Sequence, residues 1–366
     1  MRWLSALMLL CGCAGGSSAP APPELPVHPS ALRFTQALNQ ADLTYLQSIF
    51  QPAHPLAEVD PAFAVDPGWQ VLADEWLADL LMHAQDGDWQ LRKPLAVSED
   101  GSFRLQYRLV HADFSVEYFY FDARFTASSV RLEDMGNRLF QLSQVGLMEE
   151  LYHRMMLGHT RSSADFSSFF SQIGPLNRGE IGPEPLLESY TDMPDWLQQN
   201  VLPRDLMLRS LMAYGQSWYA ELSPGTKQRL LGSDYPLLET TLCLQLPDRN
   251  CGAHFSRLPL ALRQDVALQA EMGIRALQRG DTTEARGFAQ MALISGIDYF
   301  PAYWLQMQLG ILLGDYTGAL AGLDSMVQHF DVPISKSMLT QMYPDQGQQF
   351  LRSADFRRWA EQFPQE

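Results

Sequence analysis

The chain has 366 residues, enough for two domains or slightly more at about 150 residues per domain. Hydrophobic residues make up 46% of it and charged residues 19%, so the chain buries enough apolar surface to fold, which excludes a disordered or collagen-like protein. Acidic residues outnumber basic ones by 42 to 26, a formal net charge of -16. Because this charge repels a phosphate backbone and no segment concentrates basic residues, we expect no nucleic-acid partner.

The N-terminus has the features of a targeting segment. One Arg precedes an apolar stretch from Trp3 to Cys11, which is far shorter than the ~20 residues needed to span a bilayer. Residues 10–13, LCGC, then resemble the lipobox of bacterial lipoproteins, in which the final Cys is acylated and becomes the first residue after cleavage. The resemblance implies a signal peptide over 1–12, lipidation at Cys13 and a membrane attachment through that lipid.

Residues 13–29 are rich in small residues and Pro, a composition typical of a flexible or polyproline tether. Ala14 follows the lipidated Cys, whereas the family's inner-membrane retention signal is usually Asp at that position. The resemblance therefore implies an outer-membrane lipoprotein that faces the periplasm. The alternatives are an ordinary cleaved signal peptide or an incorrectly assigned start codon.

Residues 30–138 predict an α+β domain. Apolar residues recur at helical spacing over 30–51 and 69–85, and the segment between them is a proline-rich loop. After Gly87 the apolar period changes to two, and turn signals separate candidate strands at 89–97, 102–110, 114–125 and 129–135. We expect helices packed on an antiparallel meander of these strands.

This order of elements resembles the NTF2-like, or SnoaL-like, fold, and residues 34–43, FTQALNQADL, look like the first helix of that family. Such folds often form a cone that holds a small molecule. The resemblance implies an alternative function for residues 30–138, namely small-ligand binding or acid/base catalysis, which a desolvated carboxylate such as Asp134 in an apolar pocket would support.

Charged residues also occur along the predicted strands, and we assign them to a solvated sheet face. Cross-strand ion pairs on such a face explain charges of both signs without any substrate. The residues are Arg104, Arg108, Glu117, Arg131 and Glu133.

From residue 139 to 366 the pattern predicts helices. Outside the signal segment and the lipidation site, Cys243 and Cys251 are the remaining cysteines, and they bracket a turn. An extracytoplasmic location favours a disulfide between them. A soft metal site with His254 and a pair of free buried thiols are the alternatives.

An internal repeat stands out in the helical part. Gly280-Asp281 recurs as Gly314-Asp315, and Ala285 recurs as Ala319, both displaced by 34 residues. This period and these small residues resemble the tetratricopeptide repeat over about 265–330. Near the C-terminus, Phe356 and Trp359 predict an amphipathic helix that covers the open end of the array.

The resemblance implies a groove that binds a partner peptide. Transferring the family's groove positions to this register selects Ala270, Ile274, Leu277 and Gln278 in the first repeat and Trp304, Gln308, Ile311 and Leu312 in the second. None is Lys or Arg, so we expect a partner with an apolar or amphipathic segment. The alternative is that another helix of the same chain fills the groove.

Motifs for catalysis are missing from the sequence, which has no Gly-rich phosphate loop, no H-E-x-x-H, no G-x-S-x-G and no C-x-x-C. The eight His residues are scattered. We therefore expect no catalytic residue, no metal site and no cofactor. The favoured hypothesis is a non-enzymatic, membrane-tethered periplasmic lipoprotein that acts as a scaffold or adaptor for another envelope protein.

Overall fold

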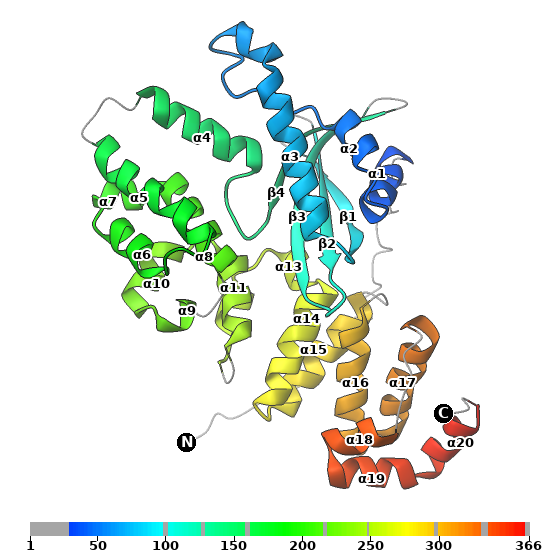
Figure 1. Cartoon of the computed structure of the whole chain (residues 1–366). Helices are drawn as coiled ribbons and strands as arrows, with labels where there is room; N and C mark the ends of the chain where they lie inside the picture. The colour runs from blue at the N-terminus through cyan, green and yellow to red at the C-terminus, as the bar shows by residue number, and fades with distance from the viewer. Residues whose placement is uncertain are drawn as a thin grey trace, which may run out of the picture.

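The computed structural model describes residues 29–97, 102–125, 129–157, 162–214, 218–246, 249–295, 299–330 and 336–362. A small antiparallel sheet with its own helices is followed by a long series of helices (Figure 1). The predicted order, an α+β region followed by a helical one, is therefore present. The predicted signal segment and Cys13 lie outside the described residues.

The helices before the sheet are α1 (Pro29–Asn39), α2 (Leu43–Ile49), the 3-10 helix η1 (Pro61–Val65) and α3 (Pro67–His83). The prediction of one helix over 30–51 is wrong, because the chain turns at Ala41, which has a φ of 49°. Asp42 then caps a new helix by accepting a hydrogen bond from the backbone N–H of Tyr45. Asp66 caps α3 in the same way, through the N–H of Gly68.

The predicted meander is confirmed. It consists of β1 (Asp88–Val97), β2 (Phe103–Val110), β3 (Val116–Phe125) and β4 (Val130–Asn137), which are antiparallel neighbours in chain order. In β2 and β3, Leu105 lies opposite Phe121 and Leu109 lies opposite Glu117. Directly opposed residues share a face, so this register decides which side chains lie under the helices.

One sheet face packs against α1, α2 and α3. Phe34 of α1 contacts Tyr107 and Phe121 edge to face, with ring centroids 5.7 and 5.0 Å apart. Leu77 of α3 and Leu105 are fully buried in the same cluster. Each such side chain contributes about 1.5–3 kcal/mol through burial, so this cluster holds the helices on the sheet.

The helical part begins with a block beside the sheet and continues as a chain of helices that leads away from it (Figure 1). The elements as far as the repeat are α4 (Gln144–Leu157), α5 (Ser162–Asn177), α6 (Glu184–Thr191), α7 (Asp195–Gln198), α8 (Val201–Tyr214), α9 (Trp218–Glu221), α10 (Pro224–Leu231), α11 (Pro236–Gln245), α12 (Gly252–Ser256) and α13 (Leu260–Arg263).

The repeat region forms two helical hairpins, α14 (Val266–Gln278) with α15 (Thr282–Ser295) and α16 (Phe300–Leu313) with α17 (Tyr316–Phe330). The first helices of the two hairpins begin 34 residues apart, at 266 and 300, and so do the second helices, at 282 and 316. Gly280 and Gly314 close the turns with φ angles of 80° and 72°, a backbone conformation that favours glycine.

The last helices are α18 (Lys336–Met342), α19 (Pro344–Arg352) and α20 (Ala354–Gln362). Phe356 and Trp359 of α20 are buried against Phe350 of α19 and Leu323 of α17. The predicted terminal cap over the last hairpin is therefore present.

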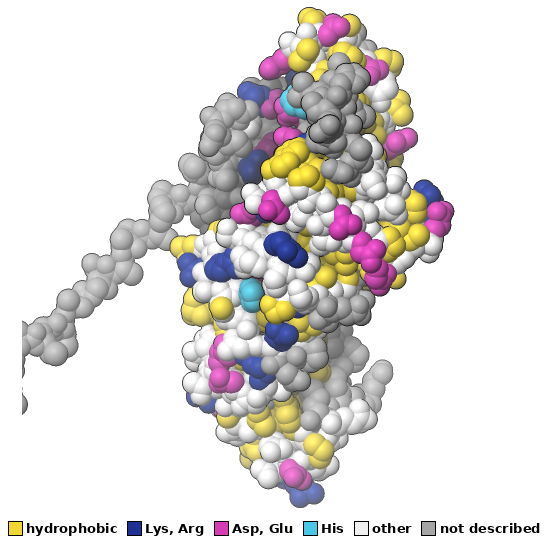
Figure 2. Space-filling view, turned by 90° about the vertical axis from the view of Figure 1, so that its left-hand side faces the viewer, with side chains coloured by type: hydrophobic (Ala, Val, Ile, Leu, Met, Phe, Trp, Pro, Cys, Tyr) yellow, Lys and Arg dark blue, Asp and Glu magenta, His cyan; other side chains and the backbone are white. Residues whose placement is uncertain are grey.

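The surface of the helical block that begins with α4 carries charges of both signs. Figure 2 shows Lys and Arg side chains on the described part of this face in separate small groups among acidic and hydrophobic ones. The described Lys and Arg residues on the face in view form no continuous basic patch, in keeping with the excess of acidic residues in the chain.

Candidate functional site

A cleft of about 240 Å³ lies between α3 and the strands β3 and β4. Apolar side chains form much of its wall, and polar groups from α3, β3 and β4 face into it. The described residues that line it are Trp76, Asp79, Leu80, His83, Glu117, Phe119, Met135, Gly136, Asn137 and Gln144. Elsewhere on this face, the described residues under α1 and α3 pack into a hydrophobic core, so the cleft lies at the edge of that core.

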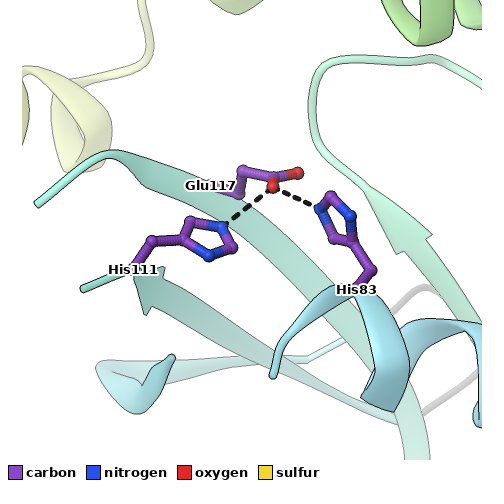
Figure 3. A group of neighbouring side chains, drawn as sticks. All are labelled: His83, His111 and Glu117. Carbon is purple, nitrogen blue, oxygen red and sulfur yellow. Dashed lines mark hydrogen bonds and ion pairs between the residues drawn. The ribbon is translucent and has the colours of Figure 1, made fainter. Parts of the chain in front are cut away.

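Glu117 is the centre of a hydrogen-bonded group at this cleft (Figure 3). Its Oε1 lies 2.6 Å from Nε2 of His83 and 3.1 Å from Nε2 of His111. Its other oxygen, Oε2, accepts a hydrogen bond of 3.0 Å from the side-chain amide of Asn137. Both carboxylate oxygens are thus held by neighbouring side chains.

The charges in this group stabilise one another. The hydrogen bond to Glu117 raises the pKa of His83 and outweighs the opposing effect of burial. Burial by itself raises the pKa of Glu117, but the hydrogen bonds and positive charge of His83 and His111 outweigh it and hold that pKa below its usual value. A carboxylate paired with an imidazole can transfer a proton or bind a cation.

Separate elements position the three side chains. His83 is the last residue of α3, and Glu117 is the second residue of β3. His111 follows β2 in a tight turn, where its backbone N–H donates to Ser115 and its carbonyl accepts from Phe114, each at 2.9 Å. The hairpin thus brings His111 beside Glu117, and the packing of α3 on the sheet brings His83.

The assignment of Glu117 to a solvated face is wrong. Glu117 lies opposite Leu109 and therefore on the face under α3, together with Phe119. The run of aromatic residues after it obscured the period of two, because Tyr118 and Tyr120 on the opposite face are also buried. The hairpin spacing of His111 and Glu117 was a usable signal, whereas nothing in the sequence linked them to His83.

Asp134 does not line this cleft. It lies opposite Asp122 on the other sheet face, where it accepts the backbone N–H groups of Met135 and Val145. Burial raises its pKa to about 6. The carboxylate in the cleft is therefore Glu117, and Asp134 holds the start of α4 against the sheet.

The sheet face expected to be solvated is covered by the helical part. Arg108 is only 6% exposed and Tyr118 only 3%. Both contact Asp265, which caps α14: Tyr118 donates a hydrogen bond of 2.6 Å, and Arg108 and Arg92 lie 3.4 and 3.1 Å from its carboxylate. The expected solvation is wrong at this end of the sheet because α13 and α14 pack there.

Cross-strand ion pairs do occur elsewhere on this face. Arg104 makes two hydrogen bonds of 2.8 and 2.7 Å to Asp122, and Arg124 binds Glu133 at 2.7 and 2.8 Å. Arg131 is exposed and lies 4.0 Å from Glu133. These pairs fit the expectation that strand charges neutralise one another.

The residues predicted to line a groove are divided among different environments. Ala270 is buried against β2 and β3, Leu277 is buried between the two hairpins, and Ile311 is buried with the C-terminal helices. Ile274, Trp304 and Gln308 are half-buried. Within the described chain, neighbouring segments therefore cover part of the predicted groove.

Cys243 and Cys251 form a disulfide, with an S–S distance of 2.04 Å and Cα atoms 5.8 Å apart. The bond joins the end of α11 to the residue before α12. His254 lies 3.5 Å from the carboxylate of Glu239 through its Nδ1. The disulfide leaves no free thiolate in this segment for a metal site.

Within the described residues, none of the helices is long and apolar enough to cross a bilayer. The chain matches no protein-family model, no curated protein and no solved structure.

Proposed function

We propose that this protein is a lipid-anchored adaptor of the bacterial cell envelope that binds another protein through a tetratricopeptide-like pair of helical hairpins. The observation that carries the proposal is the 34-residue register of α14–α15 and α16–α17, with each hairpin closed by a glycine at positive φ. Helical hairpins of this period stack side by side and present one surface to partner segments.

The chemistry of the half-buried positions defines the partner. Ile274, Trp304 and Gln308 supply an aliphatic, an aromatic and an amide side chain without a positive charge. Such a surface accepts an apolar or amphipathic segment and has no Lys or Arg among the proposed contacts to clamp a terminal carboxylate. We place the adaptor on the periplasmic side of the outer membrane, because its disulfide suits an oxidising compartment and residues 10–13 resemble a lipobox.

Site-specific photo-crosslinking in cells tests the adaptor role. A crosslinking residue at Ile274 or Gln308 is expected to give a discrete adduct with an envelope protein. The control carries the same crosslinking residue at position 294, where Ile294 is 79% exposed on α15 of the first hairpin. The proposal fails if neither position gives an adduct beyond the control while circular dichroism shows an intact helical fold.

Lipidation has its own test. Cys13→Ala is expected to abolish labelling with a fatty-acid probe and to release the protein from membranes, because the proposed acylation site is then missing. Cys243→Ala serves as the control, since that residue lies in the disulfide and its variant should remain labelled. Unchanged labelling of the Cys13→Ala variant would refute the anchor.

A second candidate function, small-ligand binding in an NTF2-like domain, is favoured by the cleft beside α3. Its wall combines Trp76, Leu80 and Phe119 with the polar pair of Glu117 and His83. A thermal-shift screen tests this function: stabilising ligands should lose their effect in Leu80→Gln and keep it in Val71→Gln, a change at a 58% exposed site on the same helix. Hits that survive both changes would argue against the cleft.

A further inference from the structure

Two imidazoles and one carboxylate converge at the end of α3. One ligand atom from each of His83, His111 and Glu117 lies within 4.8 Å of the others. They come from a helix end, a hairpin turn and a strand, and the first and last are 34 positions apart in the sequence. Such a group is the donor set of many catalytic zinc sites, which use three protein ligands and leave one position open.

An ion fits after an adjustment of the side chains, in which the two short contacts to Glu117 open and a pair of ligand atoms near the 4.8 Å limit closes by up to about 1.4 Å. Tetrahedral ligands about 2.1 Å from zinc lie about 3.4 Å from one another. Nε2 of His83 and of His111 are 2.6 and 3.1 Å from Oε1 of Glu117, so they need to retreat by less than about 1 Å. The side chain of His83 is 57% exposed at the end of its helix and is free to make this movement.

Neighbouring groups fix the orientation of the carboxylate. The amide of Asn137 donates to the outer oxygen of Glu117 and accepts the backbone N–H of Leu139 at 2.9 Å, which sets which way the amide points. Outer hydrogen bonds of this kind orient metal ligands and are needed for full affinity. Asn137 is thus a positioning residue for Glu117.

The electrostatics of the cleft favour a cation. Asp79 and Glu117 line it, and none of the described lining residues is Lys or Arg. Within the part of the chain that the structure describes, the cationic partners of Glu117 are the imidazoles of His83 and His111. Two nitrogen ligands select a transition-metal ion over Ca²⁺ or Mg²⁺, which bind through oxygen.

We propose that His83, His111 and Glu117 form a binding site for one divalent transition-metal ion of the zinc class, open toward the cleft between α3 and β3–β4. This site is separate from the hairpins of the adaptor proposal. It is tested with the metal alone, so its outcome is also independent of whether an organic ligand enters the cleft.

Calorimetric titration of the full chain with Zn²⁺ tests the site. In any chain that is neither cleaved nor acylated, Cys11 and Cys13 are first alkylated without reduction, because free thiols would bind zinc and the disulfide must stay intact. We expect one saturable site per chain. His83→Ala should weaken zinc binding by at least about 100-fold, because it removes a metal ligand. Asn137→Ala should weaken it by about 10-fold, because it removes only the hydrogen bond that orients Glu117.

A matched control is His153→Ala, which removes an exposed histidine of α4 outside the group and should leave the affinity unchanged. With Co²⁺ in place of zinc, the visible absorption of the bound ion should appear in the parent chain and be absent in His83→Gln, a second change at the same half-exposed position. The proposal is overturned if no saturable zinc binding occurs, or if the two His83 variants bind as tightly as the parent.

Discussion

Two carboxylates, the buried Asp265 and the half-buried Asp134, have opposite electrostatic surroundings. Asp265 receives hydrogen bonds or ion pairs from Tyr118, Arg108 and Arg92 and also caps α14 through the N–H of Ala267. Asp134 has backbone donors but lies opposite another carboxylate, Asp122. Asp265 therefore joins β1, β2 and β3 to α14 through its side-chain partners, whereas burial disfavours the charged form of Asp134.

Replacing Asp265 with Ala should lower the free energy of unfolding by about 3–5 kcal/mol, because the guanidinium groups of buried Arg108 and half-buried Arg92 lose their shared partner. The matched control is Asp281→Ala. Asp281 caps α15 at the surface by accepting the N–H of Glu284, and its loss should cost about 1 kcal/mol. Denaturant unfolding measures both, and equal losses would show that Asp265 acts as a cap alone.

The raised pKa of Asp134 predicts that the stability of the fold depends on pH. Its pKa is about 6 in the folded chain against an ordinary value of 3.8, so the folded state holds this proton more tightly than the unfolded state. The contribution of this proton to the free energy of unfolding is fully present below about pH 4 and is lost as the pH rises through about 6.

Asp134→Asn should therefore raise the free energy of unfolding at pH 7.5 by about 1–3 kcal/mol, and this gain should vanish at pH 4. Asp122→Asn, which removes the partner of Arg104, should instead lower stability at pH 7.5. Urea titrations at both pH values measure the effects. A loss of stability in Asp134→Asn at every pH would contradict the raised pKa.

At the scale of the elements, small residues set how closely the hairpin helices approach. A Cβ built on Gly273 would lie 2.4 Å from Leu305, and one on Gly310 would lie 2.5 Å from the backbone nitrogen of Ala319. In the second hairpin Met307 occupies the position equivalent to Gly273, and Gly310 and Gly322 provide the close approach instead. The repeat therefore keeps its period while its contact point moves along the helix.

Gly310→Ala should destabilise the chain by about 1–3 kcal/mol, because the added methyl group meets backbone that cannot turn away. Gly287→Ala is the matched control: nothing lies within 4 Å of its Cβ position in the middle of α15. That change should stabilise the chain by about 0.5–1 kcal/mol through helix propensity. Thermal unfolding compares the two variants, and a stable Gly310→Ala would disprove the tight crossing.

At the scale of the whole molecule, helices pack on both faces of the sheet, and the part of the second face that carries Arg124 and Arg131 stays exposed. One face is covered by α1, α2 and α3, while Val110, Val116 and Tyr118 on the other contact α14 and its neighbours. Tyr299 at the start of α16 also donates a hydrogen bond to the carbonyl of Phe114 in the β2–β3 turn. The α+β region and the hairpins therefore share a core.

This shared core predicts joint unfolding. Calorimetry of the full chain should show the sheet and the hairpins melting in a single transition, because separating them exposes Tyr118 and leaves Arg108 without Asp265. A fragment of residues 29–138 should bind an apolar dye strongly, as its second sheet face is uncovered. Two resolved transitions, with the lower or upper one matching the isolated fragment, would contradict this prediction.

The sequence by itself determined the local elements, since alternation and helical spacing depend on neighbouring residues. The four predicted strands agree with the structure to within two residues at their ends, and the turns at Gly280 and Gly314 follow from glycine's access to positive φ. Only the tertiary structure decided the candidate site. Glu117 meets His83 because α3 crosses the sheet, and Asp265 meets Arg108 because α14 covers the face expected to be solvated. Local periodicity reports which residues are apolar, but the contacts between distant elements decide which polar residues meet.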